Sequence, residues 1–535
     1  MRNGLSKSLI TRVLDGAPKY TVAELEKKFS PRNLPDGAMV TRVAPSPTGF
    51  MHLGTLMQAM IDKKLAKDSV GVFMLRIEDT DTKREVERAT ELIFDWLEKF
   101  GLSPDEGVQQ GGDYGPYAQS QRKDIYHSVA AELLATGRAY PCFLSTEEME
   151  GIRESQSKAG LPTGIYGEWA RDRDLSEDEI IARLDAGFIP SIRLYSTGDP
   201  SRKIFCKEAI RGSVEFPENN SDEVILKSGD RLPTYHFAHL VDDHFMRTTH
   251  VVRGMEWLPS LPLHVQMFDM MGWAPPAYIH TFTIDKLDEE TGNQRKFSKR
   301  KDPESTVGFY VENGWPEEAV LEYVFNLVAS GYEEAKTKGS AKTIWDYPAI
   351  KIKRISTSGA LFDWKKLEWW AREFITTLSV DELTRRVIDW THEYSPEWFA
   401  RISGNENYLR SVLAIERDNP KRIRKDFVTW KQTLEEVAYF WDDVFVGACG
   451  ARPLEGACHA PLQEFLKTFD IKDDKDTWWN KIVNIAAQLG ISNGDAAMSL
   501  RVALTGRTNT PDLYSIMQVM GKDRVRERVE KHMKG

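Results

Sequence analysis

The 535-residue sequence predicts an α/β protein with a parallel sheet in its first half, a long insertion within that sheet domain, and a helical C-terminal region. Three observations carry this prediction. Residues 39–77 have the pattern strand, tight turn, helix, strand, and two strands joined by a helix run parallel in one sheet. Strand-prone and aromatic residues return at 230–257 after a long irregular stretch. Beyond Pro303 the apolar spacing is almost entirely helical.

Length and composition bound the class of protein. The chain is too long for one hydrophobic core, so we expect several domains. No window reaches the ~20 apolar residues of a membrane span, and residues 1–13 lack the apolar core of a signal peptide. Four cysteines without a paired spacing fit a reducing compartment, so we expect a cytoplasmic protein without membrane contact. The net charge of -10 argues against unspecific coating of nucleic acid, although local basic patches can still bind RNA.

Residues 1–37 are interpreted as a helical extension. Thr21 is a candidate N-cap with Glu24 three residues later, the spacing of a capping box, and Pro31 and Pro35 end the helical pattern. The sequence indicates no function for this segment.

The turn after the first strand has the features of a phosphate site. Residues 43–55 pass from a β-prone run through two prolines and a glycine to a helix that begins near Gly54. Backbone N–H groups and the positive end of the helix dipole gather at such a helix start. His52 adds a ring donor, and Gly54 allows close approach to the backbone. The alternative is an ordinary strand-to-helix connection with a structural histidine, and a lone His-x-Gly favours it.

The second strand, residues 70–77, is followed by three carboxylates, Glu78, Asp79 and Asp81. Ligands bind at the carboxyl ends of strands in open α/β sheets. Carboxylates repel phosphate, so we expect a cationic partner there, an ammonium group or Mg²⁺. The alternative is a solvated strand end that caps a helix over residues 85–100.

Residues 118–232 are predicted to form an inserted domain. We expect it to hold no zinc, because Cys142 alone cannot supply a thiolate tetrad. Cys449 and Cys458 also lack a zinc-like spacing, so the thiols are interpreted as core side chains.

The sheet domain is predicted to resume with a strand at residues 230–239. Potential metal ligands cluster from there onward: His236, His239, Asp242, Asp243, His244 and His250. We reject a metal centre, because no donor pair has an evident supporting shell and the intervening aromatic run fits a strand packed on a helix.

A polar turn and five basic residues within seven positions follow at residues 287–301. A solvated basic loop is the ordinary interpretation of such a run. Amphipathic helices are predicted at residues 317–329, 361–374, 380–390 and 434–445. Basic residues of the C-terminal region are candidate phosphate contacts, with surface helix faces as the alternative: Lys421, Arg422, Arg424, Lys425, Lys522, Arg524, Arg526 and Arg528.

Three of these stretches together resemble a known family. Residues 43–55 resemble the "HIGH" signature of class I aminoacyl-tRNA synthetases, and Pro-Ser-Pro-Thr-Gly at 45–49 resembles the form found in bacterial-type glutamyl-tRNA synthetases. That family also carries Arg-Ile-Glu-Asp-Thr-Asp, as at residues 76–81. Residues 296–300 resemble the second signature, "KMSKS", in its Lys-x-Ser-Lys-Arg form. The two signatures stand in the expected order with a split domain between them, which is more specific than either alone.

The resemblance implies a Rossmann-type nucleotide-binding catalytic domain, split by an acceptor-binding insertion and followed by an all-helical anticodon-binding region. The implied parts are an N-terminal extension (1–37), the first half of the catalytic domain (38–117), the insertion (118–232), the second half (233–290), a signature-loop and stem-contact region (291–343) and the anticodon-binding domain (344–535). The implied reaction is ATP-dependent ligation of L-glutamate to tRNA(Glu) through a glutamyl-adenylate. Mg²⁺ would accompany ATP, zinc would be absent, and the enzyme would be a monomer.

Site residues carry over by their position in the family motifs. His52, Lys296 and Lys299 are implied as catalytic. The implied ATP site comprises Pro45, Thr48, His52, Gly54, Thr55, Glu256, Trp257, Lys296, Phe297, Ser298, Lys299 and Arg300. The implied glutamate site comprises Arg42, Ser46, Glu78, Tyr235, His239 and Arg253. No residue is implied as a metal ligand.

The sequence departs from the family pattern at His239, where Asn is usual, at Arg247, where a small residue is common, and at Met255, where a second Glu is common. An imidazole at position 239 can still donate to a carboxylate, but its charge is expected to vary near neutral pH.

Three rival functions stay open. A glutaminyl-tRNA synthetase shares the fold but typically has Pro-Glu-Pro where this chain has Pro-Ser-Pro at 45–47, and it ends in β-barrels. An enzyme that glutamylates a modified tRNA nucleoside lacks a C-terminal domain of this size. A catalytically inactive paralogue would bind only RNA or protein.

Overall fold

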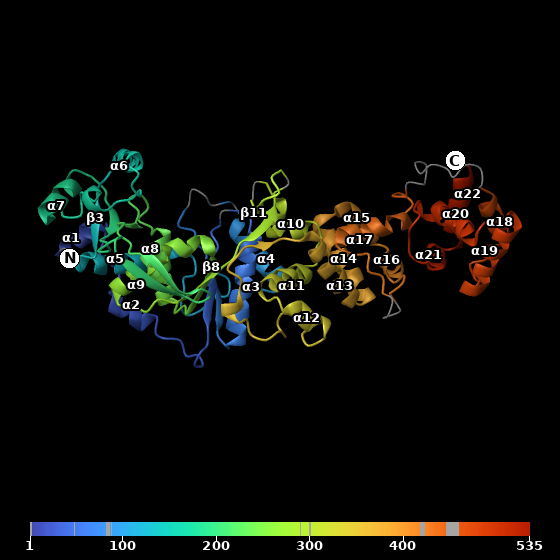
Figure 1. Ribbon diagram of the computed structural model, residues 1–535, viewed down its shortest axis with the longest axis horizontal. Coiled ribbons are helices and arrows are strands. Elements are labelled where there is room, and N and C mark those ends of the chain that lie inside the picture. The colour runs from blue at the N-terminus through green and yellow to red at the C-terminus, as the bar shows by residue number, and fades with distance from the viewer. Residues whose placement is uncertain are drawn as a thin grey trace. The chain divides into compact units, whose positions relative to one another are not determined.

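The computed structural model describes residues 3–47, 49–81, 86, 88–288, 290–298, 301–417, 423–445 and 459–534. Two compact units make up the chain: residues 1–308 with 324–362, and residues 309–323 with 363–535. Strands lie in the part of the chain coloured blue to yellow in Figure 1, and the orange-to-red part is helical. The α/β fold class with a helical C-terminal region is therefore confirmed. No helix in these ranges has the length and apolarity that a membrane span requires.

Parallel strands form the centre of the first unit. β1 (Val40–Val43) pairs in parallel with β2 (Val72–Leu75), and β8 (His250–Gly254) pairs in parallel with β9 (Ala277–Thr281). The N–H of Thr249 donates to the carbonyl of Val40 at 2.9 Å, which joins the two pairs. Helix α3 (Leu53–Asp68) connects β1 to β2, so the predicted βαβ unit is confirmed. The helix predicted at residues 85–100 is α4 (Ala89–Lys99), and residues 82–85 and 87 lie outside the described ranges.

Between the two strand pairs the chain forms helices and antiparallel strands. In chain order these elements are η1 (Gln119–Arg122), α5 (Lys123–Ala135), β3 (Ala139–Cys142), α6 (Thr146–Lys158), η2 (Gly167–Trp169), α7 (Glu177–Asp185), β4 (Ser191–Leu194), β5 (Lys203–Glu208), β6 (Gly212–Pro217) and β7 (Val224–Leu226). β3, β4 and β7 form one antiparallel sheet, and β5 and β6 form an antiparallel hairpin.

Helix α8 (Tyr235–Phe245) occupies the place where the sequence predicted a strand at residues 230–239, so that prediction is wrong. Phe237, Val241 and Phe245 are buried and lie four residues apart, the spacing of one helix face. Aromatic and β-branched residues also have a high strand propensity, which explains the error. β8 follows α8, and η3 (Met255–Ser260) and α9 (Leu261–Met271) then precede β9.

The N-terminal segment packs into the first unit as α1 (Lys7–Val13) and α2 (Val22–Lys28). The predicted capping box is confirmed, because Thr21 Oγ1 accepts from the N–H of Glu24 and the Glu24 carboxylate accepts from the N–H of Thr21. Leu9 and Phe29 belong to one hydrophobic cluster with residues of α5 and α8. This segment is thus part of the core of the first unit.

The second family signature, which is rich in lysine and arginine, begins at the end of a β-hairpin. β10 (Ile284–Leu287) pairs antiparallel with β11 (Gln294–Lys296) and parallel with β12 (Ala360–Leu361). The elements between β11 and β12 are η4 (Pro303–Ser305), α10 (Val307–Glu312), α11 (Glu317–Val328), α12 (Tyr332–Thr337) and η5 (Ile352–Arg354).

The C-terminal part of the chain is helical over its described residues. Its elements are α13 (Trp364–Thr377), α14 (Val380–Tyr394), α15 (Pro396–Ile402), α16 (Glu406–Leu413), α17 (Trp430–Val437), η6 (Ala438–Phe440), α18 (His459–Thr468), α19 (Lys475–Leu489), α20 (Asn493–Thr505), α21 (Leu513–Met520) and α22 (Lys522–Lys534). Apolar residues from nearly all of these helices share one core cluster, for example Leu383, Leu434 and Ile482. The helix predicted at 361–374 begins later, at Trp364, because Ala360 and Leu361 pair with β10.

Candidate active site

The turn after β1 presents a histidine at the start of a helix. His52 is the N-cap of α3, and its Nδ1 accepts a hydrogen bond from the N–H of Gly54 at 3.1 Å. In a neutral ring the proton then sits on Nε2, which can donate to an anionic oxygen. A Cβ at position 54 would come within 3.3 Å of His52 Nδ1, so glycine suits this cap. The ring and the helix N-terminus together form a candidate phosphate site.

The carboxylates after β2 have different partners. The N–H of Glu78 donates to the carbonyl of Pro45 at 3.1 Å, which places the first signature beside the end of β2. The Glu78 carboxylate accepts from Arg76 Nη2 at 3.2 Å. Burial raises the pKa of Glu78, although the charge of Arg76 opposes the shift. Asp79 instead accepts from the N–H and the hydroxyl of Ser120 at 2.7 and 2.6 Å, a structural role.

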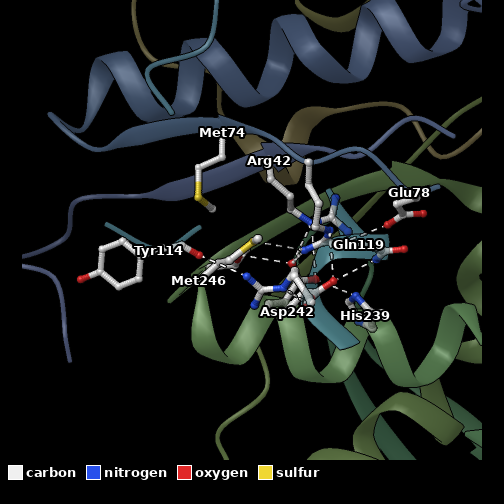
Figure 2. A network of polar contacts seen from close by, with 12 residues as sticks. Arg42, Met74, Glu78, Tyr114, Gln119, His239, Asp242 and Met246 are labelled. Atoms are coloured by element: carbon white, nitrogen blue, oxygen red, sulfur yellow. Dashed lines mark hydrogen bonds and ion pairs between the residues drawn. The ribbon is translucent and has the colours of Figure 1, made fainter. Parts of the chain in front are cut away.

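Two arginines share one buried aspartate in a polar network that joins the sheet to α8 (Figure 2). Arg42 on β1 places Nε 3.1 Å from Asp243 Oδ1, and Arg76, after β2, places Nη1 2.6 Å from the same oxygen. All three side chains are at most 4% exposed, so the charges are stabilised by each other rather than by water. Burial alone would lower the pKa of Arg42, but the Asp243 charge raises it.

The neighbouring Asp242 holds the chain after β2 against α8. Its carboxylate accepts from Arg122 Nε at 2.6 Å, from Gln119 Nε2 at 2.9 Å and from the Tyr126 hydroxyl at 2.8 Å. Burial and the Asp242 charge raise the pKa of Tyr126. Both aspartates of the rejected metal centre therefore bind arginines. In the part of the chain that the structure describes, no three His, Cys, Asp or Glu side chains are grouped to hold a metal ion.

His239 is fully buried between Asp243 and Tyr278. Its Nδ1 lies 2.6 Å from Asp243 Oδ2, and its Nε2 lies 2.9 Å from the Tyr278 hydroxyl. Burial lowers the pKa of His239 to about 4, although the Asp243 charge opposes the shift. A neutral ring fits these partners, with the proton on Nδ1 and Nε2 accepting from the tyrosine. The sequence-based expectation that this charge varies near neutral pH is therefore wrong, because burial moves the titration to acid.

Arg253 on β8 lies between two histidines. Its Nε donates to His280 Nε2 at 3.0 Å, and its Nη1 lies 3.1 Å from His264 Nδ1. Burial lowers the pKa of both rings, so both are neutral at physiological pH and do not repel the guanidinium. The N–H of His280 donates to Glu208 of β5 at 2.8 Å, so the β5–β6 hairpin supports the strand beside Arg253.

Tyr235 lies among the charged residues predicted to hold an amino acid. Its ring stacks on Trp257 with the centroids 4.1 Å apart and the planes inclined by 26°. Burial raises the pKa of Tyr235, and the charges of Arg253, Glu78 and Arg42 also act on its hydroxyl. The structure thus brings together these four residues of the predicted glutamate site.

The other two predicted glutamate contacts differ in exposure. Ser46 is exposed beside Pro45, whereas His239 has no exposed surface. The ring of His239 is parallel to that of Tyr235, with 6.2 Å between the centroids. His239 therefore supports the candidate pocket from behind.

The second signature begins at the end of β11. Lys296 Nζ lies 3.4 Å from Glu256 Oε1, and both side chains are half exposed. The Phe297 ring is buried against Phe362 at 5.2 Å between centroids, so only its backbone can face a nucleotide. The N–H of Ser298 donates to Asp302 Oδ2 at 2.8 Å. The predicted site residues Thr48, Lys299 and Arg300 lie outside the described residues.

The first of the two remaining departures from the family pattern has a structural explanation. Arg247 donates to the carbonyl of Phe29 and pairs with Glu26 at 2.6 Å, so it fixes the N-terminal segment to the end of α8. His244 also contacts Glu26 at 2.6 Å. Nothing in the structure explains Met255.

Sequence reasoning did not identify Arg76, His264, Tyr278 and His280 as residues that organise the site. It named Asp243 as a potential metal ligand but not as the shared partner of two arginines. A signal existed for Arg76 and Asp243, because charged residues at buried positions of apolar elements require a partner of opposite charge. The histidines and the tyrosine carry no such signal in the sequence.

Comparisons with known proteins identify the family. Residues 38–369 match the family model "tRNA synthetases class I (E and Q), catalytic domain", and residues 422–533 match the model "Anticodon binding domain". The glutamate–tRNA ligase of Clostridium perfringens (strain SM101 / Type A) is 41% identical, over 98% of this chain and 98% of that protein. The glutamate–tRNA ligase of Sorangium cellulosum (strain So ce56) is 38% identical, over 95% of this chain and 97% of that protein.

Solved structures give the same relationship. The glutamate–tRNA synthetase of Elizabethkingia anophelis superposes with a TM-score of 0.76 and 28% identity, covering 93% of this chain and 100% of that one. A glutamate–tRNA ligase of Elizabethkingia meningosepticum, solved in complex with its amino acid, superposes with a TM-score of 0.73 and 27% identity, covering 93% and 99%. With both family models matched in order and relatives aligned over nearly their whole length, the chain belongs to the glutamate–tRNA ligase family of class I tRNA synthetases.

Proposed function

We propose that this chain activates L-glutamate with ATP and transfers it to tRNA(Glu) in the cytoplasm, and that Arg42, Glu78, Tyr235 and Arg253 bound the amino-acid pocket. The observation that carries the proposal is the pair of buried arginines, Arg42 on β1 and Arg253 on β8, whose charges both act on the hydroxyl of Tyr235. Glutamate carries two carboxylates, and a guanidinium can hold a carboxylate with two parallel hydrogen bonds. Two arginines therefore suit a doubly anionic amino acid.

Each pocket residue has a distinct role in this proposal. Arg42 and Tyr235 meet the side-chain carboxylate, and Arg253 meets the α-carboxylate. Glu78, assisted by Ser46, holds the ammonium group. The raised pKa of Glu78 fits this role, because an ammonium group placed beside it favours the ionised form again.

The first chemical step joins two anions, so positioning and charge neutralisation dominate its catalysis. The α-carboxylate attacks the α-phosphorus of ATP, which gives glutamyl-adenylate and releases pyrophosphate. His52 and the start of α3 hold phosphate oxygens, while Lys296 and Lys299 stabilise the charge that develops on the leaving pyrophosphate.

The rest of the nucleotide site follows the predicted positions. Trp257 and Glu256 hold the nucleoside, and Lys296 exchanges its contact with Glu256 for a phosphate when ATP binds. Mg²⁺ enters with ATP and is held largely by phosphates and water, so it needs no cluster of protein ligands.

In the second step the terminal ribose hydroxyl of tRNA attacks the acyl carbon, and AMP leaves. The insertion supports the acceptor end, and the C-terminal helices bind the anticodon.

Two of the arginines predicted as phosphate contacts are instead buried and paired within the protein. Arg528 is 4% exposed and pairs with Asp442, and Arg424 is 7% exposed and pairs with Asp426. Arg528 therefore connects helical segments through the carbonyls of Tyr439 and Leu504, whereas Arg424 pairs within its own connecting segment. Lys421 and Arg422 lie outside the described residues.

Glutamine is a poor substrate for such a pocket. Its side chain offers Arg42 one neutral carbonyl, and its NH₂ points donors at a donor. Arg42 keeps Asp243 as a partner of its Nε, but its substrate-facing N–H groups would meet the NH₂ group, and leaving buried donors unpaired costs more free energy than one weak hydrogen bond returns. All of these groups come from one chain, so we expect the monomer to be active.

Two measurements test the proposal. ATP–pyrophosphate exchange in the presence of tRNA should depend on glutamate, and charging should be assayed on separate tRNA(Glu) and tRNA(Gln) transcripts. We expect exchange with glutamate and charging of tRNA(Glu). Absence of exchange under these conditions would indicate an inactive paralogue. Glutamine-dependent exchange of comparable kcat/KM would indicate a glutaminyl enzyme.

A further inference from the structure

A cluster of ion pairs connects the residues that flank the second signature. The second signature begins at Lys296, the last residue of β11. Asp302 follows the signature and directly precedes η4. The Asp302 carboxylate receives Arg295 Nη1 on Oδ2 at 2.6 Å and Arg295 Nη2 on Oδ1 at 2.9 Å. This is a bidentate ion pair between Arg295, which precedes the signature, and Asp302, which follows it.

Further donors converge on the same carboxylate. Lys286 Nζ lies 3.1 Å from Asp302 Oδ1, and the N–H of Ser298 donates to Oδ2 at 2.8 Å. The Asp302 side chain is only 1% exposed, so water screens these contacts little. The Arg295 hydrogen bonds, with Ser298 and Lys286, hold the pKa of Asp302 well below its usual range, and the group stays ionised at any physiological pH.

The two cations have second partners on the flanking segments. Arg295 Nε donates to Asp288 Oδ2 at 2.8 Å, and Lys286 Nζ donates to Glu304 Oε1 at 2.8 Å. β10, β11 and the start of η4 are therefore tied together by side chains. The backbone adds a closed turn, because the N–H groups of Lys301 and Asp302 donate to the carbonyl of Ser298 at 3.1 and 2.8 Å.

We infer that the Arg295–Asp302 pair is a clamp that positions the second signature, and that Arg295 and Asp302 are positioning residues of the activation step. The side chains of Arg295 and Asp302 hold the backbone of Lys296 and Ser298 in place and need not touch the substrate. Fixing both ends of the segment limits the arrangements open to Lys296, which therefore meets the departing pyrophosphate at a smaller entropic cost. This role rests on the proposed activation of glutamate by ATP.

The first test measures the clamp itself and does not depend on catalysis. Asp302→Asn keeps the shape of the side chain but removes its charge and places an NH₂ group among donors. Limited trypsin digestion, followed by mass spectrometry of cuts between Arg295 and Asp302, reports how accessible this segment is to the protease. We expect cleavage about tenfold faster than in the wild type, since several charge-assisted hydrogen bonds are lost. The control Lys338→Gln removes an exposed pair with Glu334 and should leave this cleavage unchanged.

The second test measures pyrophosphate exchange in Asp302→Asn, Arg295→Gln and the double variant. We expect each single variant to lower kcat by about 10- to 100-fold, with KM for glutamate within about twofold of wild type. The double variant should be no slower than the slower single variant, because the two residues act as one unit.

The outcomes separate the clamp from the proposed reaction. Unchanged cleavage in Asp302→Asn, unchanged kcat, or losses that multiply in the double variant would overturn the clamp. A wild-type enzyme without glutamate-dependent exchange would refute the proposed function, and the cleavage rates would still decide whether the clamp exists.

Discussion

Arg42 and Asp243 form a buried ion pair, with the arginine Nε 3.1 Å from Oδ1 of the aspartate, although 201 residues separate them in the sequence. The same oxygen accepts from Arg76 Nη1 at 2.6 Å. One carboxylate thus serves two guanidinium groups, so Arg42 shares its ionic partner with Arg76. The remaining N–H groups of Arg42 can still donate to an anionic substrate.

We expect the Arg42→Ala variant to lose activity with glutamate without gaining activity with glutamine. Asp243 would keep Arg76 as its ionic partner, and Tyr235 alone, without a positive charge, would meet the side-chain carboxylate of the substrate. Sites built on such polar pairing discriminate against an analogue by about 10⁴ or more, and most of that ratio should vanish through a fall in kcat/KM for glutamate. The measurement is pyrophosphate exchange with tRNA and each amino acid at several concentrations. Arg42→Lys is the matched control that keeps the charge and removes the fork. A variant that still prefers glutamate at the wild-type ratio would show that Arg42 does not face the side chain.

The buried neutral His239 should make the protein sensitive to acid. Its pKa is lowered from 6.5 to about 4 by burial, so between these pH values the unfolded state binds the proton and the folded state does not. Stability is therefore fully present above about pH 6.5 and falls as the pH drops toward 4. One such group changes the free energy of unfolding by about 1.4 kcal/mol per pH unit in that window.

Thermal unfolding at a series of pH values checks this expectation. His239→Asn should show a shallower decrease of Tm between pH 6.5 and 4 than the wild type. His392→Asn offers a control, since His392 lies in the other compact unit. Equal slopes in the wild type and His239→Asn would contradict the assignment of His239 as a source of the acid sensitivity.

Lys299→Ala should slow the activation step by about 10²–10³, the scale of losing one donor that acts in the transition state. Lys299 lies outside the described residues, so this prediction rests on its place in the second signature. Pre-steady-state formation of glutamyl-adenylate is the measurement, and Tm should stay near the wild-type value. Lys301→Ala is the neighbouring control, expected within a few-fold of wild type. Adenylate formation by Lys299→Ala at nearly the wild-type rate would remove this lysine from the mechanism.

The insertion should fold without zinc. Cys142 is 2% exposed, and burial raises the pKa of its thiol, which disfavours the thiolate that zinc requires. Metal analysis of protein purified without added zinc and dialysed against chelator should find far less than one equivalent. Retention of about one mole of zinc per mole of protein would contradict this prediction.

Local patterns predicted the parts of this fold that local physics determines. The βαβ unit, the capping box at Thr21 and the helical C-terminal region follow from turn residues, caps and apolar spacing that lie within a few residues of one another. Helix α8 was not predicted, because Phe237 and its aromatic neighbours have a high strand propensity. Only the residues that they pack against in the folded chain distinguish a helix from a strand here.

Long-range pairing could not be predicted in the same way. The sequence indicated Arg42 and Arg253 through family position, but not that Asp243 and His280 hold them, because those partners meet only in the folded chain. Arg528 illustrates the converse. It stands in a basic run that suggested RNA contact, yet it is buried and donates to the carbonyls of Tyr439 and Leu504. A basic pattern cannot show which helix covers it.

The placement of the N-terminal helices has a consequence for synthesis on the ribosome. The ring of Phe29 packs on Phe245 with 5.8 Å between centroids, and Arg247 binds the Phe29 carbonyl. About 200 residues must be added after Phe29 before these partners exist, which takes ~10–40 s at ~5–20 residues per second. During that interval the apolar faces of α1 and α2 lack part of their native cover. Pausing of the ribosome before residue 245 should therefore increase the demand for chaperones that bind the nascent N-terminus.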